Sequence, residues 1–285
     1  MTDGGAQPDP PAPGGRPGSP ALVALDIDGT ILDHDQRMSE PVREAVQAVA
    51  RSGVHVVLST GRSLHGTLPV LDRLGLLEGW AVCSNGTVTL RLDPSLPEGY
   101  EVSDIVTFDP TSALMLLREH LPTAAFAVEE IGRGYRLTAP FPPGELDGDE
   151  VIVPFEDLLD APASRVIVRS PDHTSADFLA LTEGLGLHGV NYFVGWTAWL
   201  DLAPSGVSKA SALEVVRRRL GVSGAATMAV GDGRNDVEMF AWAARAVAMG
   251  NSEPEVKAAA DEVTGGVEED GLAVVLRSLL NGSRH

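Results

Sequence analysis

The stretch "LVALDIDGTILD", residues 22–33, ends an apolar run on two acids. Its first part, residues 22–25, has the continuously apolar character of a strand buried in the middle of a parallel sheet. Asp26 and Asp28 follow directly, and Gly29-Thr30 predict a turn behind them. Burying an unpaired carboxylate is costly, so a strand that ends on two carboxylates predicts a compensating positive charge at the same place.

Around this strand the chain alternates short apolar runs with helical periodicity. A helix over 39–51 is predicted by apolar residues spaced along one helix face, Val42, Ala45, Val46 and Val49. The further elements are the strands "VHVVLS" (54–59) and "WAVCS" (80–84), a helix to Leu220, the strand "ATMAVGD" (226–232), a helix through Asn235 to Ala244, the strand "AVAMG" (246–250) and a final helix from 271. This alternation predicts an α/β fold whose core is Rossmann-like, with three layers and a parallel sheet.

The rhythm is interrupted between residues 87 and 199, where prolines and glycines become frequent and the strands alternate apolar with polar residues. Two amphipathic helices are expected there, one starting at Asp109-Pro110 and one near Ser175. This texture predicts an inserted α+β domain over 87–199, flanked by the two core segments 21–86 and 200–285. Residues 1–20, rich in proline and glycine, are expected to form a disordered tail.

Composition restricts the class of partner. The net charge is −19 and the pI is about 4.6, so the surface repels nucleic acids and anionic membranes. No apolar run reaches the roughly 20 residues of a membrane helix, and the first residues do not resemble a secretory signal. Cys83, the only cysteine, cannot form an intramolecular disulfide. We expect a soluble, cytoplasmic protein that takes a small ligand, with no nucleic-acid or membrane partner.

Four short motifs fall at strand ends or helix starts: Asp26 with Asp28, "STGR" (59–62), Lys209, and "GDGRND" (231–236). In an open α/β sheet the carboxyl ends of the strands form the ligand-binding edge. Each motif alone has an ordinary interpretation as a turn, a helix start with an exposed arginine, or a solvated lysine. Their joint occurrence at one edge is what a single reaction mechanism predicts.

Four acids at one edge need cations. Two carboxylates about 4 Å apart repel each other by roughly 4 kcal/mol at an effective dielectric constant of about 20. Oxygen ligands favour Mg²⁺, and the predicted metal site is formed by Asp26, Asp28, Asp232 and Asp236. Lys209, one of two lysines in a chain that otherwise uses arginine, supplies a compact second cation.

This set of groups suits phosphoryl transfer through an aspartyl phosphate. Asp26 would attack phosphorus, and Asp28 would protonate the leaving oxygen and then deprotonate the attacking water. Thr60 and the Gly61 amide can donate hydrogen bonds to a phosphoryl oxygen.

The order of the motifs resembles the haloacid dehalogenase-like (HAD) superfamily, and within it the Cof-type phosphatases with a large type-IIB cap. The matching segments are "LDIDGTIL", "LSTGRS", "PSGVSKASAL" and "VGDGRNDVEMF", followed by "AVAMGNSEPEVKAAADEVT" and "EEDGLAVVL". The resemblance covers nearly all of 21–281, the cap matching only in position and size. Ser252 and Phe240 depart from the usual alanine and leucine.

The resemblance implies a role for each matching residue. Asp26 is the nucleophile, and Asp28 is the acid/base whose main-chain carbonyl also reaches Mg²⁺. Asp232 is a side-chain metal ligand that Asp236 supports. The residues that hold the phosphate are Thr60, Gly61, Lys209 and Asn235. Asn85-Gly86 match a position near the substrate.

The implied activity is hydrolysis of small phosphorylated metabolites, sugar phosphates first and phosphorylated cofactors such as flavin mononucleotide or pyridoxal phosphate next. Two alternatives stay open: a sugar phosphomutase on the same core, and a non-catalytic phosphate-binding or receiver module. The substrate-selecting residues are expected in the cap, where the polar and aromatic candidates are Glu130, Arg133, Tyr135 and Trp196. Chain crossings near 86 and 200 are expected to act as hinges of a moving cap. Oligomeric state leaves no signal in the sequence.

Overall fold

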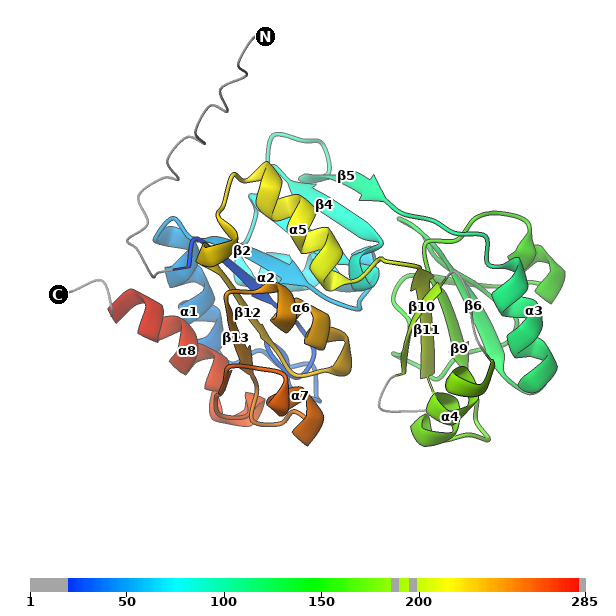
Figure 1. Cartoon of the computed structure of the whole chain (residues 1–285). Coiled ribbons are helices and arrows are strands. Elements are labelled where there is room, and N and C mark those ends of the chain that lie inside the picture. Colours follow the sequence, from blue (N-terminus) through cyan, green and yellow to red (C-terminus); the bar gives the residue numbers. More distant parts are fainter. Residues whose placement is uncertain (1–19, 186–189, 195–198, 282–285) are drawn as a thin grey trace, which may run out of the picture.

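The fold has two bodies, each built around its own β-sheet, as the computed structural model shows (Figure 1). The structure describes residues 20–185, 190–194 and 199–281. The chain forms most of the larger body, crosses to the smaller one, and returns to finish the larger body. The predicted α/β class is confirmed.

The core sheet has eight strands in the order β14-β13-β12-β1-β2-β3-β4-β5. Its strands are β1 (Leu22–Leu25), β2 (His55–Ser59), β3 (Gly79–Cys83), β4 (Val88–Leu92), β5 (Tyr100–Ile105), β12 (Thr227–Gly231), β13 (Arg245–Ala248) and β14 (Glu262–Val263). Neighbouring strands from β14 to β3 run parallel to one another. Strand β4 runs antiparallel to both of its neighbours, β3 and β5. Strand β1 lies in the middle and is fully buried, as its apolar run predicts.

Helices cover both faces of the core sheet and give it three layers. One face packs against α1 (Glu40–Arg51), α2 (Leu64–Leu74) and α8 (Gly271–Asn281), and the other against α5 (Lys209–Arg219), α6 (Val237–Trp242) and α7 (Pro254–Ala258). Alternate residues of β1 enter the two hydrophobic cores, Val23 on the first face and Ala24 on the second. Ser39 caps α1 by accepting a hydrogen bond from the Val42 amide (3.2 Å).

The cap sheet has six strands in the order β10-β11-β9-β6-β7-β8. Its elements are β6 (Ala125–Glu130), β7 (Gly134–Leu137), β8 (Asp149–Ile152), β9 (Val166–Arg169), β10 (Val190–Val194) and β11 (Trp199–Pro204), with the helices α3 (Thr111–His120) and α4 (Ser175–Leu185). Phe126 and Val128 of β6 pack into the same cluster as Leu114 of α3 and Phe178 of α4. These helices therefore cover one face of the cap sheet, and the opposite face is turned toward the core.

The chain passes from the core sheet to the cap sheet, and back, at residues other than the predicted bounds of the insert, 87 and 199. Strands β4 and β5 pair onto the core sheet, and β11 belongs to the cap sheet. The chain therefore crosses between Ile105 and Thr111, where the cap helix α3 begins, and returns after Pro204. Hairpin strands with alternating apolar and polar residues have the same sequence pattern in either sheet. The pattern therefore assigns 87–105 to the insert, although these strands belong to the core sheet.

Short 3₁₀ turns complete the fold. They are η1 (Ser84–Gly86), η2 (Phe155–Leu159), η3 (Gly224–Ala226), η4 (Arg234–Asp236) and η5 (Val267–Glu269). Turn η1 follows β3 and turn η4 follows β12, so both stand at the carboxyl edge of the core sheet, which faces the cap. Within the described part of the chain, no helix has the length and apolar character needed to cross a membrane.

Candidate active site

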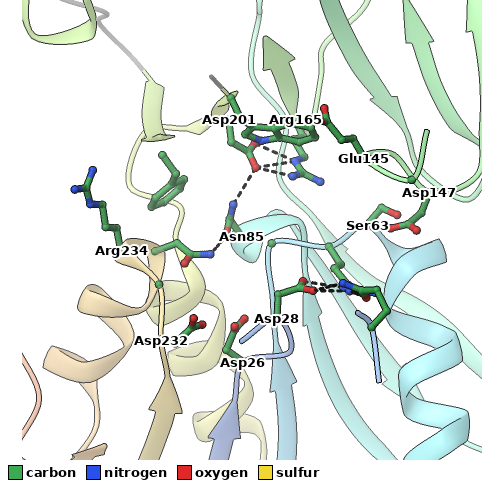
Figure 2. Close-up of a pocket in the computed structure, with 18 of the residues that line it drawn as sticks. Asp26, Asp28, Ser63, Asn85, Glu145, Asp147, Arg165, Asp201, Asp232 and Arg234 are labelled. Atoms are coloured by element: carbon green, nitrogen blue, oxygen red, sulfur yellow. Dashed lines mark hydrogen bonds and ion pairs between the residues drawn. The ribbon is translucent and has the colours of Figure 1, made fainter. Parts of the chain in front are cut away.

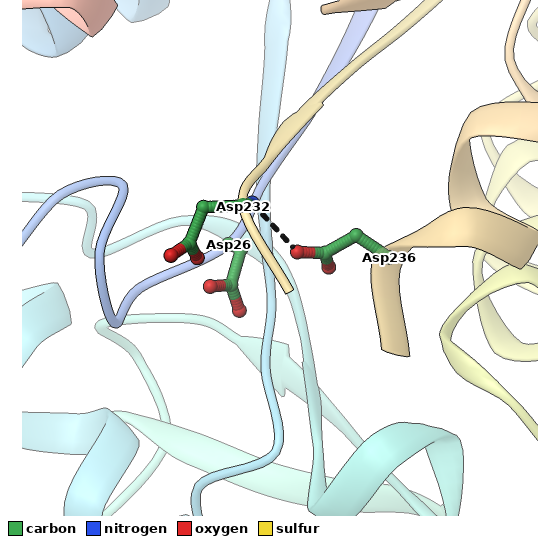
Figure 3. Close-up of side chains that lie close together, drawn as sticks. All are labelled: Asp26, Asp232 and Asp236. Atoms are coloured by element: carbon green, nitrogen blue, oxygen red, sulfur yellow. Dashed lines mark hydrogen bonds between the residues drawn. The ribbon is translucent and has the colours of Figure 1, made fainter. Parts of the chain in front are cut away.

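Three carboxylates converge at the carboxyl edge of the core sheet. Asp26 follows β1, Asp232 follows β12 and Asp236 ends η4, and each offers an oxygen within 4.8 Å of the others (Figure 3). Asp236 is fixed by its Oδ2, which accepts hydrogen bonds from the amides of Asp232 and Gly233, both at 2.9 Å. All three acids are buried.

A buried lysine lies against this cluster. Lys209 Nζ donates to Asp26 Oδ1 and to Asp236 Oδ1, both at 2.6 Å, and its side chain has no exposed surface. The side chain starts from the first residue of α5, which Ser208 and Ser211 cap reciprocally. Burial by itself lowers the pKa of Lys209, but the charges of Asp236 and Asp26 outweigh burial and raise that pKa above its ordinary value. Lys209 is therefore the positive charge that the strand ending at Asp26 requires.

One ammonium group does not balance three carboxylates. Burial, opposed by Lys209 and reinforced by nearby acids, raises the pKa of Asp26 to about 7. Burial together with the charges of Asp26 and Asp236 raises the pKa of Asp232 to about 8. The cluster carries two excess negative charges when fully ionised, and its donors are all carboxylate oxygens, so it fits a hard divalent cation such as Mg²⁺.

The Asp28 side chain stands apart from this cluster and pairs with Arg62. Arg62 Nε donates to Asp28 Oδ2 at 2.8 Å and Arg62 Nη2 to Oδ1 at 2.5 Å, and Gln36 Nε2 adds a bond of 3.3 Å. Burial acts to raise the pKa of Asp28, but the bonds from Arg62 and Gln36 lower that pKa overall. The Asp28 carboxylate is half-exposed and lines the pocket described below. The arginine of "STGR" is thus an ion-pair partner instead of an exposed side chain.

The predicted phosphate ligands lie on three neighbouring segments. Thr60 and Gly61 follow β2, Lys209 begins α5, and Asn235 lies in η4. The Thr60 hydroxyl oxygen accepts a hydrogen bond from the Arg62 amide at 3.1 Å, which shapes the loop. A Cβ on Gly61 would lie 3.3 Å from Asn85 Oδ1, so a side chain here would crowd Asn85.

Asn85 and Gly86 occupy different positions relative to the pocket. Asn85 lines it, and its Oδ1 accepts a hydrogen bond from Asn235 Nδ2 at 2.9 Å. Gly86 has a φ of 103° and packs against the start of α5, where a Cβ would come within 2.2 Å of the Ser208 carbonyl oxygen. Gly86 is not among the described residues that line the pocket.

Asn251, which the sequence analysis did not assign to the site, links two parts of it. Its Nδ2 donates to the Gly29 carbonyl (2.9 Å) and to Asp232 Oδ2 (3.0 Å), and its Oδ1 accepts from the Val267 amide (2.9 Å). The signal was present, because Asn251 lies just beyond the predicted strand 246–250, at the same sheet edge as the acids.

A pocket of about 620 Å³ opens between the two bodies, directly over this edge (Figure 2). The cap side of the pocket includes Tyr135, Glu145, Asp147, Arg165, Trp199 and Asp201. Of the four cap residues that the sequence suggests for substrate contact, Tyr135 lines the pocket. Glu130 and Arg133 do not line it, and Trp196 lies outside the described residues. The pair of Arg165 and Asp201 has no motif around it, so the sequence analysis missed both.

Fold and site together define a capped α/β protein whose centre combines a strand-end aspartate, a lysine and further carboxylates. A family model described as haloacid dehalogenase-like hydrolase matches residues 23–135 and 142–276, so the chain belongs to that family. The predicted membership is confirmed, and with it the class of enzyme: a HAD-type phosphatase that acts on small phosphorylated compounds.

Two curated relatives are named for their reactions. The chain is 28% identical over 258 residues to a 5-amino-6-(5-phospho-D-ribitylamino)uracil phosphatase of Bacillus subtilis, covering 90% of this chain and 94% of the relative. It is 29% identical over 275 residues to an HMP-PP phosphatase of Serratia proteamaculans, covering 91% and 95%.

Solved structures share the fold over almost the whole chain. A HAD subclass IIB sugar phosphatase superimposes with a TM-score of 0.77 at 22% identity, covering 90% of this chain and 98% of the other. A haloacid dehalogenase-like hydrolase from B. subtilis gives a TM-score of 0.77 at 23% identity, covering 90% and 99%. The comparison thus extends to the cap as well as to the core.

Proposed function

We propose that this protein is a Mg²⁺-dependent phosphatase that hydrolyses small phosphorylated metabolites, sugar phosphates first, through a phosphorylated Asp26. The observation that carries the proposal is the contact of Lys209 Nζ with both Asp26 and Asp236 at 2.6 Å. It places a fixed cation beside a strand-end carboxylate that points toward a pocket large enough for a small metabolite. The roles that follow belong to this proposal.

In the first step an Asp26 oxygen forms a bond to phosphorus while the ester P–O bond breaks. Asp28 gives its proton to the leaving oxygen. The ion pair with Arg62 favours ionised Asp28, so the acid step requires the Asp28 side chain to leave Arg62 when substrate enters. In the second step Asp28 takes a proton from water, the water oxygen binds phosphorus, and the Asp26–P bond breaks to release inorganic phosphate.

Phosphate is held by groups that do not change during the reaction. The Gly61 amide, the Thr60 hydroxyl, Lys209 Nζ and Asn235 Nδ2 are the proposed donors to its oxygens. A Mg²⁺ ion held by Asp26, Asp232, Asp236 and the Asp28 carbonyl would neutralise negative charge on phosphate and carboxylates. Such fixed positive charge acts most strongly on the transition state.

The cap side of the pocket supplies the groups that would select the substrate. Tyr135 and Trp199 offer flat apolar faces, and Glu145 and Asp147 offer acceptors suited to hydroxyl groups. Because the net charge of −19 disfavours nucleic acids, we infer that the substrate is a small molecule. The one cysteine, Cys83, is buried and free, and we place the protein in the cytoplasm.

The experiment is phosphate release from a panel of sugar phosphates, nucleotides and phosphorylated cofactors, with Mg²⁺ and with a chelator. We expect chelator-sensitive release, highest on a sugar phosphate. Release that persists after full chelation would contradict the metal dependence. An isomeric sugar phosphate in place of free phosphate would contradict hydrolysis and indicate a mutase.

A further inference from the structure

Turn η1 of the core has an unusual backbone. Three consecutive residues have positive φ: Ser84 at 48°, Asn85 at 53° and Gly86 at 103°. For a residue with a Cβ this left-handed conformation costs free energy, and it persists only where the surroundings fix it. The turn is therefore held by contacts beyond its own sequence. Within the core, the Ser84 amide donates to the Arg62 carbonyl at 2.7 Å and the Asn85 amide to the Thr60 carbonyl at 3.0 Å.

Two buried carboxylates of the cap add side-chain contacts. Glu129 of β6 accepts bonds from Ser84 Oγ at 3.0 and 2.8 Å. Asp201 of β11 accepts a bond from Asn85 Nδ2 at 3.1 Å (Figure 2). The four residues are all buried, so water does not compete strongly for these bonds.

Arg165 fixes Asp201 in turn. Its Nε lies 2.9 Å from both carboxylate oxygens, and its Nη2 lies 2.6 Å from Oδ2. Such a forked pair has one favoured geometry, which sets the direction in which Asp201 Oδ2 faces Asn85. A buried ion pair of this kind contributes orientation more than net stability.

The Asn85 side-chain amide connects Asp201 of the cap to Asn235 of the core. A planar amide whose nitrogen is fixed by Asp201 has its oxygen fixed as well, and Asn85 Oδ1 accepts the bond from Asn235 Nδ2 at 2.9 Å. Asn235 is the residue of η4 that we propose as a phosphate ligand. An unbroken series of hydrogen bonds thus runs from Arg165 in the cap to the phosphate side of the pocket.

We propose that Asp201, held by Arg165, is a positioning residue that acts through Asn85 to orient the Asn235 amide toward the transferred phosphoryl group. The inference rests on the proposed function, because it takes Asn235 as a phosphate ligand. When the cap is displaced, Asn85 loses the acceptor that fixes its amide, and Asn235 loses its fixed partner. The phosphate site is therefore complete only while the cap is seated over the core.

The central test is a double-mutant cycle on kcat. Asp201→Ala and Asn235→Ala are each compared with the wild type and with the double variant, using the best substrate of the panel. We expect Asp201→Ala to lower kcat about 10- to 100-fold, because small misplacements of a catalytic contact have effects of this size. In the Asn235→Ala background the same change should lower kcat less than twofold.

A second readout separates phosphate orientation from contact with the rest of the substrate. Orthovanadate with Mg²⁺ mimics the phosphoryl group and has no leaving group for the cap to touch. We expect the inhibition constant for orthovanadate to rise about tenfold in Asp201→Ala. A residue that only contacts the leaving group, or only supports the cap, would leave this constant unchanged.

Two further variants guard against misfolding. Asp172→Ala removes another cap carboxylate, one that accepts a bond from Thr123 Oγ1 at 2.8 Å and does not line the pocket, and it should keep wild-type kcat. Asn85→Gly suits the positive φ and removes both amide bonds, so it should fold and should reproduce the Asp201→Ala loss. Thermal unfolding of each variant confirms that assays are made on folded protein.

The outcomes are distinct. Unchanged kcat and vanadate affinity in Asn85→Gly, or a full Asp201→Ala effect that remains in the Asn235→Ala background, would overturn the coupling and leave the phosphatase function intact. A wild-type protein without turnover on any substrate would reject the proposed function first, and the coupling with it.

Discussion

The core and the cap each contain a buried group of charges, and the two groups are balanced differently. In the core, Lys209 faces three carboxylates and leaves negative charge in excess. In the cap, the Arg165–Asp201 pair is matched charge for charge, and burial raises the pKa of the neighbouring Glu129 carboxyl above its ordinary value. An unbalanced buried cluster has to take a cation, whereas a balanced one holds its neighbours in place. In the functions that we propose, the core carries the chemistry and the cap positions groups of the core.

The largest expected effect tests the core. Asp26→Asn removes the nucleophile and one of the repelling carboxylates, so kcat should fall by at least about a thousandfold while the melting temperature stays equal or rises. Steady-state kinetics and thermal unfolding measure the two quantities. Turnover within tenfold of the wild type would show that Asp26 is not the nucleophile.

Metal removal is the next test of the unbalanced cluster. Chelation should abolish turnover, and added Mg²⁺ should restore it and raise the melting temperature of the wild type. Asp232→Asn serves as the matched control, because it should weaken the Mg²⁺-induced rise. A rise of equal size in that variant would place the ion elsewhere.

Breaking the buried Arg165–Asp201 pair of the cap should lower the stability of the protein. Arg165→Met leaves Asp201 buried without its cation and should lower the free energy of unfolding by about 3 kcal/mol, measured by urea denaturation. The comparison variant is Arg118→Met, which breaks the exposed pair with Glu156 and should cost less than about 1 kcal/mol. Equal losses in both variants would contradict the distinction between buried and exposed pairs.

A smaller effect concerns pH in the chelated protein. The pKa of Asp26 is about 7 and that of Asp232 about 8, both above the ordinary value, so the folded state binds protons more tightly than the unfolded state. Their contribution to stability is therefore present below about pH 4 and is lost as pH rises through 7 to 8. Urea midpoints measured in chelator should decline between about pH 4 and pH 8, and Asp26→Asn should flatten the decline. A midpoint that rises instead would contradict the charge excess.

The two regions also differ in how well their sequence predicts them. In the core, residues such as Asp26 and Lys209 lie where a strand or helix begins or ends, so a local pattern locates them and the shared sheet edge brings them together. The pairing of Arg62 with Asp28 was not predicted, because it depends on side-chain geometry across two loops. The helix predicted over 39–51 rests on apolar periodicity alone, and the structure has it as α1, which begins at Glu40 after the cap residue Ser39.

In the cap, a residue reaches the pocket only if it lies on the face of its strand that is turned toward the core. Trp199 and Asp201 of β11 line the pocket, while Leu200 and Leu202 between and beyond them pack toward the helices. Alternation of this kind is visible in the sequence, but it does not say which face meets the core. That choice is set by the register of β11 against β9, in which Asp201 pairs with Ile167, and by the seating of the whole sheet.

The contact between Lys209 and Asp26 joins residues 183 positions apart in the chain, with the entire cap sheet encoded between them. Strand β1 has β2 as an early neighbour, but its other neighbour, β12, is made only after the whole cap sheet. During translation the aspartate is therefore present long before its lysine, and the centre cannot be assembled until the chain beyond the cap sheet has been made. Truncated chains that end before β12 lack Asp232 and Asp236, and with them two of the three carboxylates of the cluster.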